Sequence, residues 1–169
     1  MMRQTRKQTL TIVLRLAAFF VAAGLALPAL ADDLATSYVV DTLTGVALDG
    51  MDPVSYFTGP APLVGKSDYE YDWSGVPWYF ANGADRDVFI RSPETYAPQF
   101  GGHAAMSLAQ GFLSDGDPRL YLILADRLYL FYSDASRIAF SAAPAASIKA
   151  AHTHWSALSP SLSASANTP

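Results

Sequence analysis

The chain has 169 residues, with 11 Lys and Arg, 15 Asp and Glu and no cysteine, and its formal net charge is −4. Without cysteine the fold cannot depend on disulfide bonds, so its hydrophobic core must stabilise it. An acidic chain without a basic cluster lacks the electrostatic surface that binds nucleic acids or anionic lipids, which excludes both as partners.

The first predicted element is a cleavable secretory signal over residues 1–31. A basic stretch at residues 3–7 precedes an apolar segment at residues 16–27. This segment has the length of a signal h-region, roughly 7–15 residues, and is shorter than the ~20 residues that a membrane-spanning helix needs. Small residues before Asp32 predict cleavage after Ala31. We therefore expect a periplasmic protein without a stable membrane anchor, with an uncleaved N-terminal anchor as the alternative.

Removal of the signal makes the chain more acidic, because seven Lys and Arg then remain against 15 Asp and Glu, a net charge of −8. The mature length of about 138 residues suits one domain with its own core. We expect an N-terminal lead-in over residues 32–47, a globular domain over residues 48–156, and a disordered tail over residues 157–169, which is rich in Ser, Ala and Pro. No internal repeat is visible in the sequence.

The globular domain is predicted to be α+β, a small single domain with two antiparallel β-hairpins packed against several short helices. Asp52 and Pro53 are expected as the N-cap and first residue of a short helix. Alternating apolar residues and turn signals predict hairpins that pair residues 69–73 with 76–80 and residues 120–124 with 128–132. Further short helices are predicted at residues 83–91, 93–96, 103–110, 134–140 and 144–155.

Several motifs occur in order between Leu48 and Trp155. They are Asp-Pro-Val-Ser-Tyr-Phe at 52–57, Trp-Ser-Gly at 73–75 with Trp-Tyr-Phe at 78–80, Asp-Arg-Asp-Val-Phe at 85–89, Pro-Glu-Thr-Tyr-Ala-Pro-Gln-Phe-Gly-Gly at 93–102, and Leu-Tyr-Leu at 128–130. Together they resemble the exported YHS domain-containing proteins of bacteria. The resemblance implies a small YHS-like fold related to metal-binding modules of heavy-metal sensing and transport.

One departure from the family weakens the metal prediction. Members often carry Gly-Gly-Tyr-Cys-Ala where residues 101–105 here are Gly-Gly-His-Ala-Ala, so Ala104 replaces the cysteine. A thiolate gives a small site its affinity for Cu(I) or zinc, and metal binding is therefore not carried over. His103 and Met106, on one face of the predicted helix, are the candidate ligands of a weakly bound copper or zinc ion. Alternatively, His103 is hydrogen-bonded inside the pocket and Met106 fills core space.

A ligand pocket is expected between the helix at Asp52, the first hairpin and the helix after Gly101. The candidate ligand-binding residues are Asp52, Tyr56, Trp78, Tyr79, Gly101, Gly102 and His103. Asp52 and the three aromatic residues could instead have structural roles, since an Asp before Pro is usually a helix cap and such aromatic residues usually belong to the core. His152 and His154 point to different faces of a helix, which disfavours a chelating pair.

These residues predict a non-catalytic periplasmic module that binds a small ligand or, weakly, a metal ion. Two alternatives stay open. One is a degenerate structural or interaction protein without a ligand, which the loss of the cysteine favours. The other is an enzyme in which His103 acts as general acid or base, with Asp52 or a tyrosine orienting it.

Overall fold

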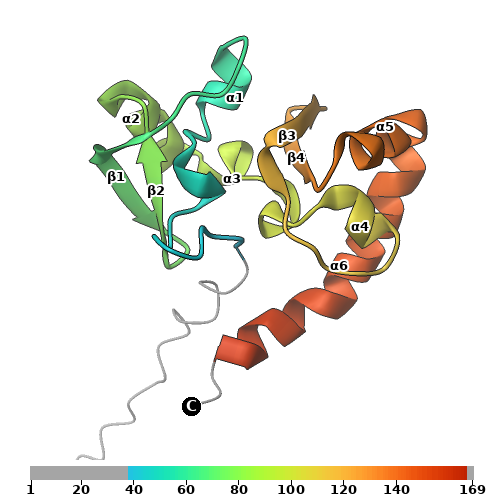
Figure 1. Cartoon of the computed structure of the whole chain (residues 1–169). Helices are drawn as coiled ribbons and strands as arrows, with labels where there is room; N and C mark the ends of the chain where they lie inside the picture. Colours follow the sequence, from blue (N-terminus) through green and yellow to red (C-terminus); the bar gives the residue numbers. More distant parts are fainter. Residues whose placement is uncertain (1–37, 167–169) are drawn as a thin grey trace, which may run out of the picture.

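The computed structural model describes residues 38–166, and the predicted signal at residues 1–31 lies outside this range. The protein is α+β, with two two-stranded antiparallel sheets surrounded by helices, as the sequence predicts (Figure 1). Within the described range, none of the helices combines the length and the apolar character needed to cross a bilayer.

The elements follow each other in two similar series. The first series is η2 (Leu48–Gly50), α1 (Ser55–Thr58), β1 (Lys66–Trp73), β2 (Val76–Phe80), α2 (Gly83–Arg91) and α3 (Pro93–Tyr96). The second is η3 (Gln99–Gly102), α4 (Ala105–Ala109), β3 (Asp117–Leu124), β4 (Arg127–Phe131), α5 (Asp134–Ala142) and α6 (Pro144–Ala166). Each series is therefore a 3-10 turn, a short helix, a hairpin and two helices, and we call them the first repeat (residues 48–96) and the second repeat (residues 99–166).

The two hairpins match in detail. In each, the first strand has 8 residues and the second has 5. The outermost pairs, Lys66 with Phe80 and Asp117 with Phe131, are both followed by a register shift that lengthens the first strand. This shift explains why β1 and β3 each begin earlier than the alternation of apolar residues predicts.

The helix that follows each hairpin is also built alike. Asn82 caps α2 and Ser133 caps α5, each by accepting the backbone N–H of the third residue along. Phe89 of α2 and Phe140 of α5 are fully buried. Each packs against the phenylalanine that ends its hairpin, with ring centroids 5.2 Å apart in both repeats.

The structure thus contains a duplication, although no internal repeat is visible in the sequence. When residues 65–96 are aligned with residues 116–147, the identical pairs are Gly65 and Gly116, Phe80 and Phe131, Ala84 and Ala135, Arg86 and Arg137, Phe89 and Phe140, and Pro93 and Pro144. Most other positions differ in residue type. Because a fold requires apolar side chains of suitable volume rather than particular residues, the structural repeat persists where sequence identity is low.

Strand β4 joins the two repeats. Leu128 and Leu130 belong to the hydrophobic cluster of the first repeat, whereas Tyr129 and Phe131 belong to that of the second. Successive side chains of a strand point to opposite faces, so one strand can pack into both clusters. The repeats therefore lie side by side with β4 between their cores, as Figure 1 shows.

The last helix is longer than predicted. Residues 157–166 continue α6 instead of forming a disordered tail, and residues 167–169 lie outside the described range. Helix α6 packs on α4 and extends past the body of the molecule (Figure 1). Leu158 still packs against the second cluster, and this contact accounts for the continuation of the helix beyond Trp155.

Candidate ligand site between the repeats

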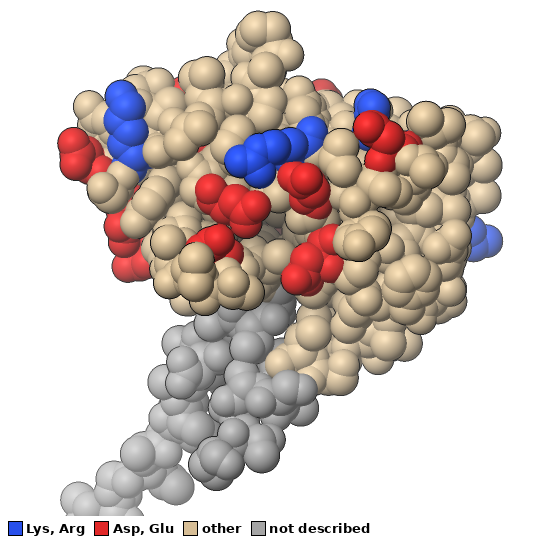
Figure 2. Space-filling view, in the orientation of Figure 1, with Lys and Arg blue, Asp and Glu red and all other residues tan. Residues whose placement is uncertain are grey.

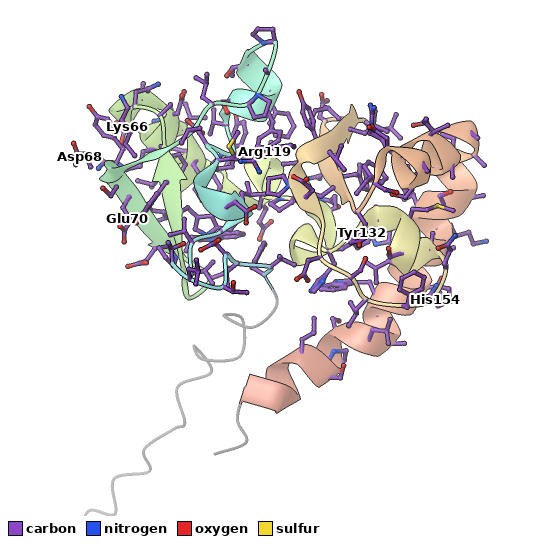
Figure 3. All side chains as sticks on the ribbon, in the orientation of Figure 1. Lys66, Asp68, Glu70, Arg119, Tyr132 and His154 are labelled. Carbon is purple, nitrogen blue, oxygen red and sulfur yellow. The ribbon has the colours of Figure 1, made fainter. Side chains whose placement is uncertain are left out.

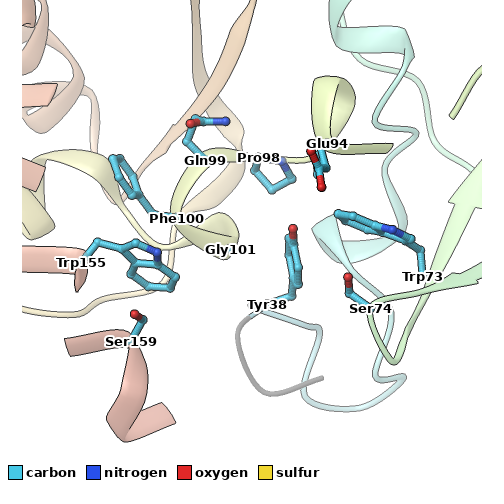
Figure 4. A pocket seen from close by; sticks show the side chains of 11 residues that line it. Tyr38, Trp73, Ser74, Glu94, Pro98, Gln99, Phe100, Gly101, Trp155 and Ser159 are labelled. Carbon is cyan, nitrogen blue, oxygen red and sulfur yellow. The ribbon is translucent and has the colours of Figure 1, made fainter. Parts of the chain in front are cut away.

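A cavity of about 430 Å³ lies between the first hairpin, the η3 turn and α6 (Figure 4). This volume is within the range of about 300–1,000 Å³ that is typical of small-molecule sites. The lining residues come from both repeats, from the link between them and from the lead-in segment: Tyr38, Trp73, Ser74, Glu94, Ala97, Pro98, Gln99, Phe100, Gly101, Trp155 and Ser159.

One wall of the cavity is formed by Tyr38 and Trp73. Their ring centroids are 5.5 Å apart and their planes are tilted by 59°. Trp73 is supported by Trp78 and Phe89, whose ring centroids lie 5.7 and 5.6 Å from its own. The lead-in is held in place by the N–H of Val39, which donates to the Gly101 oxygen at 2.7 Å. The wall is therefore fixed by the core of the first repeat and by the η3 turn.

The opposite wall is formed by Phe100 and Trp155. Phe100 has a φ of 57° and Gly101 a φ of 62°, so the η3 turn passes through the left-handed region, where glycine is favoured. The ring of Trp155 on α6 lies 6.1 Å from that of Phe100 and 5.6 Å from that of His103. Figure 4 shows Trp155 facing the cavity from α6, across from Tyr38 and Trp73.

Glu94 supplies the one charged side chain among the lining residues of the described chain. It lies in the first turn of α3 and is exposed. The hydroxyl of Tyr38 points toward it (Figure 4). Burial, and secondly the charge of Glu94, raise the pKa of Tyr38 to about 12, so the phenol stays neutral at physiological pH. The cavity thus combines aromatic surface with one carboxylate.

Of the predicted ligand-binding residues, Gly101 lines this cavity and the others lie elsewhere. Asp52 is fully buried, and its oxygens accept backbone N–H groups. Oδ1 accepts from Val54 at 2.8 Å and, at 3.4 Å, from Ser55, and Oδ2 accepts from Ala81 at 2.8 Å. Helix α1 begins at Ser55 with Val54 as its N-cap, so the prediction that Asp52 is the N-cap is wrong. Asp52 instead accepts the backbone N–H groups of the turn that leads into the helix.

The electrostatics of Asp52 follow from its burial. Desolvation raises the pKa of this carboxyl to about 6, opposed by the two backbone N–H bonds from Ala81 and Val54 and assisted by the nearby carboxylate of Asp85. The pKa is shifted toward the range of a general acid or base, but the group faces backbone amides rather than the cavity.

The three predicted aromatic residues have contacts away from the cavity. The hydroxyl of Tyr56 donates to the Pro118 oxygen at 2.8 Å, linking α1 to β3. Trp78 is completely buried, and its Nε1 donates to the Trp73 oxygen at 3.0 Å. Tyr79 is half-buried against Gly50. None of these three rings lines the cavity, and two of them, Tyr56 and Trp78, are buried in the core of the first repeat.

His103 lies outside the helix in which the sequence placed it. Its backbone is extended, with φ −67° and ψ 148°, and α4 begins at Ala105, so His103 and Met106 do not share a helical face. The reason is the bridge that His103 forms with Asp115 beside the η3 turn, which corresponds to the bridge of Met51 in the first repeat. The prediction that His103 and Met106 lie on one helical face, on which the metal site was based, is therefore wrong.

The surroundings of His103 do not form a metal-binding cluster. The residue is 7% exposed, and its Nδ1 lies 3.6 Å from Oδ1 of Asp115 without a hydrogen-bond partner. Burial lowers the pKa of the imidazole, and the Asp115 carboxylate partly opposes this effect. Met106 packs against the second cluster. Within residues 38–166, no group of three His, Cys, Asp or Glu side chains is placed to hold a metal ion.

The two histidines of α6 have separate contacts. Nδ1 of His154 lies 2.8 Å from the Leu108 oxygen, and because a carbonyl can only accept, this nitrogen carries the proton. The ring of His152 packs on Phe100 at 4.9 Å. This arrangement agrees with the expectation that i, i+2 positions on a helix do not chelate together.

The face shown in Figure 2 is mainly acidic around one arginine, which Figure 3 labels as Arg119. Burial raises the pKa of Asp49 there, the Asp41 carboxylate adds to this effect, and Arg119 opposes it.

A second hollow, of about 460 Å³, lies between β3 and α5. Two arginines, Arg119 and Arg137, line this hollow. The positive charge of Arg137 is paired with the Asp134 carboxylate at 2.8 Å, so the hollow is less suited to an anionic ligand than its two arginines suggest.

The sequence reading missed Tyr38, Trp73, Glu94 and Trp155 as site residues. Tyr38 belongs to a segment predicted as a lead-in, and Trp155 ends a helix predicted to pack onto the domain. Aromatic residues are common in ligand sites, so residue type could have marked these three as candidates, but only tertiary contacts bring them to one cavity.

No family model, curated protein or solved structure matches this chain.

Proposed function

We propose that this chain is an exported, non-catalytic binding module of the YHS type, and that it holds a small organic ligand in the cavity between its repeats. One observation carries the proposal. Tyr38, Trp73, Glu94 and Trp155 come from four separate segments, and their side chains line the same cavity. A concave site lined by aromatic surface with a few polar groups is the common form of a small-molecule site.

The exposure of these rings supports binding rather than core packing. Tyr38, Trp73 and Trp155 are half-buried, whereas Trp78 and Phe89 behind them are completely buried. The core of the first repeat is therefore already filled without the outer faces of the lining rings. Large aromatic surface left beside a cavity is available to a ligand.

The distribution of titratable groups supports binding rather than catalysis. Asp52 and His103 have pKa values shifted by burial, as catalytic groups often do. Neither residue lines the cavity. A ligand held there would contact the carboxylate of Glu94 and the neutral phenol of Tyr38.

A weak metal site at His103 is the second candidate, and one observation favours it. Nδ1 of His103 is buried without a hydrogen-bond partner, and a buried polar atom usually has one. The carboxylate of Asp115, with Oδ1 3.6 Å from this nitrogen, could supply a second metal ligand. Two ligands of this kind would bind copper or zinc weakly.

The three tryptophans allow the ligand proposal to be tested in a single NMR experiment. Trp73 and Trp155 line the cavity, and Trp78 is buried in the core. We expect compounds from a fragment library to shift the indole N–H signals of Trp73 and Trp155 in the signal-free chain, with a smaller change at Trp78. A library that leaves both lining signals unchanged would favour the alternative of a structural protein without a ligand.

A blocking variant shows whether the shifts arise in this cavity. Ser159 lines it from α6, so Ser159→Phe should fill part of the space and abolish the shifts. Ser156 is an exposed residue on the same helix that does not line the cavity, so Ser156→Phe is the matched control and should leave them unchanged. Equal effects of both substitutions would show that the ligand binds elsewhere.

A further inference from the structure

The composition of the cavity restricts the charge of its ligand. Its charged group is a carboxylate, and no lysine or arginine is among its lining residues. Arg127 lies nearby but donates to the backbone oxygen of Glu94 at 3.3 Å. None of the ion pairs found within residues 38–166 involves the carboxylate of Glu94. An anionic ligand would face an unpaired negative charge, whereas a cation would be attracted to it.

The aromatic walls restrict the chemistry further. Trp73 and Tyr38 meet at 59°, and this tilted pair lines the cavity beside Glu94. A cation over the face of Trp or Tyr is attracted by the ring quadrupole, most strongly when it is weakly hydrated. Pairs of aromatic walls with a nearby carboxylate are therefore suited to methylated ammonium groups.

A metal ion fits the same cavity poorly. Hard cations such as Ca²⁺ require about six to eight oxygen ligands, and softer ions require nitrogen or sulfur ligands. The lining supplies a single carboxylate, that of Glu94, and the neutral side-chain oxygens of Tyr38, Ser74, Gln99 and Ser159, but no histidine or cysteine. Its volume of about 430 Å³ suits an organic group rather than a single ion.

We propose that the cavity binds an organic monocation of the quaternary-ammonium class, held against the rings of Tyr38 and Trp73 and facing the carboxylate of Glu94. This inference rests on the proposed function, because it names the ligand class of the same cavity. The net charge of −8 expected for the mature chain adds a long-range attraction for cations, which salt screens.

The test compares choline with 3,3-dimethylbutan-1-ol, a neutral molecule of nearly the same shape. Both are titrated at constant ionic strength while the indole signals of Trp73 and Trp155 are followed by NMR. We expect choline to bind at least tenfold more tightly than the alcohol, because the alcohol keeps the apolar contacts but lacks the charge. Higher salt should weaken the binding of choline more than that of the alcohol.

Two carboxylate variants identify the group that selects the cation. Glu94→Gln should weaken choline binding by about three- to tenfold and leave the alcohol unaffected, since it removes the charge and keeps the shape. Glu70→Gln is the control, because Glu70 is exposed on β1 and does not line the cavity (Figure 3). This substitution should change neither affinity.

The outcomes separate this inference from the proposed function. If the alcohol binds as tightly as choline, or Glu94→Gln has no effect, the inference is overturned while the cavity remains a ligand site. The same holds if neither binds but a neutral or anionic library compound shifts the two tryptophan signals. If no compound of any charge shifts them, the proposed function itself fails.

Discussion

Oδ2 of Asp52 accepts the backbone N–H of Ala81 at 2.8 Å and thereby fastens the start of α1 to the end of β2. The other oxygen accepts the N–H of Val54 at 2.8 Å. At the matching position the second repeat has Ala104, which is also fully buried but carries no carboxylate. The carboxylate link therefore belongs to the first repeat alone, among the two that the structure describes.

We expect Asp52→Ala to destabilise the protein. The substitution leaves the buried N–H of Val54 and the partly buried N–H of Ala81 without acceptors, which should lower the free energy of unfolding by about 2–3 kcal/mol. Urea unfolding followed by circular dichroism measures the change. Asp68→Ala is the control, because Asp68 is exposed on β1 (Figure 3), and it should stay within about 0.5 kcal/mol of the wild type. Equal effects would contradict a structural role for Asp52.

The pH dependence of stability should report the raised pKa of Asp52. Because its pKa is about 6 in the fold and lower in the unfolded chain, folding favours the protonated form. The contribution of Asp52 to the free energy of unfolding is therefore largest below about pH 4 and is lost as pH rises through 6. The stability advantage of the wild type over Asp52→Asn should shrink between pH 4 and pH 7. Unfolding both proteins across this range tests it, and a constant difference would show that the pKa is unshifted.

Gly65 and Gly116 occupy equivalent positions, and both should resist substitution. A Cβ at Gly65 would lie 2.5 Å from the Tyr79 backbone, and one at Gly116 would lie 2.5 Å from Cβ of Leu130. Since these neighbours belong to strands, either change to alanine must displace a hairpin, at a cost of about 1–3 kcal/mol. Thermal unfolding of both variants provides the measurement.

Gly83→Ala is the matched control for these two substitutions. A Cβ there would meet only the Tyr69 ring, at 3.7 Å, an ordinary contact at the start of α2. This variant should be neutral or slightly more stable, because alanine favours helix. If the alanine at Gly83 lowered the melting temperature as much as the other two, the close approach of the strands would not be the cause.

Metal titration shows whether His103 is a metal ligand or only a structural residue. Nδ1 of His103 lies near the exposed Asp115, and within residues 38–166 no third His, Cys, Asp or Glu joins them, so we expect Cu(I), Cu(II) and Zn(II) to bind the chain from Asp32 onward weakly at best. His103→Ala should remove any such binding, and His154→Ala should leave it unchanged, because Nδ1 of His154 is bonded to the Leu108 oxygen. Submicromolar binding that disappears in His103→Ala would show a genuine metal site.

The helix at His103 illustrates where the sequence was misleading. Ala, Met, Ser and Leu after residue 103 favour a helix, and α4 does form at Ala105. The preceding turn, with positive φ at Phe100, Gly101 and Gly102, leaves His103 extended and paired with Asp115. Helix propensity describes each residue singly, whereas this boundary depends on a pairing with a strand-like segment later in the chain.

Local patterns determined the α+β class, the two hairpins and the start of each helix after them, because alternation of apolar residues, turn residues and caps act over a few neighbours. Tertiary structure decided that these elements form a duplicated unit, that β4 serves both cores, and that Tyr38, Trp73, Glu94 and Trp155 meet at one cavity. The physical reason is that such contacts join residues far apart in the chain, and their free energy depends on how whole elements pack rather than on any local pattern.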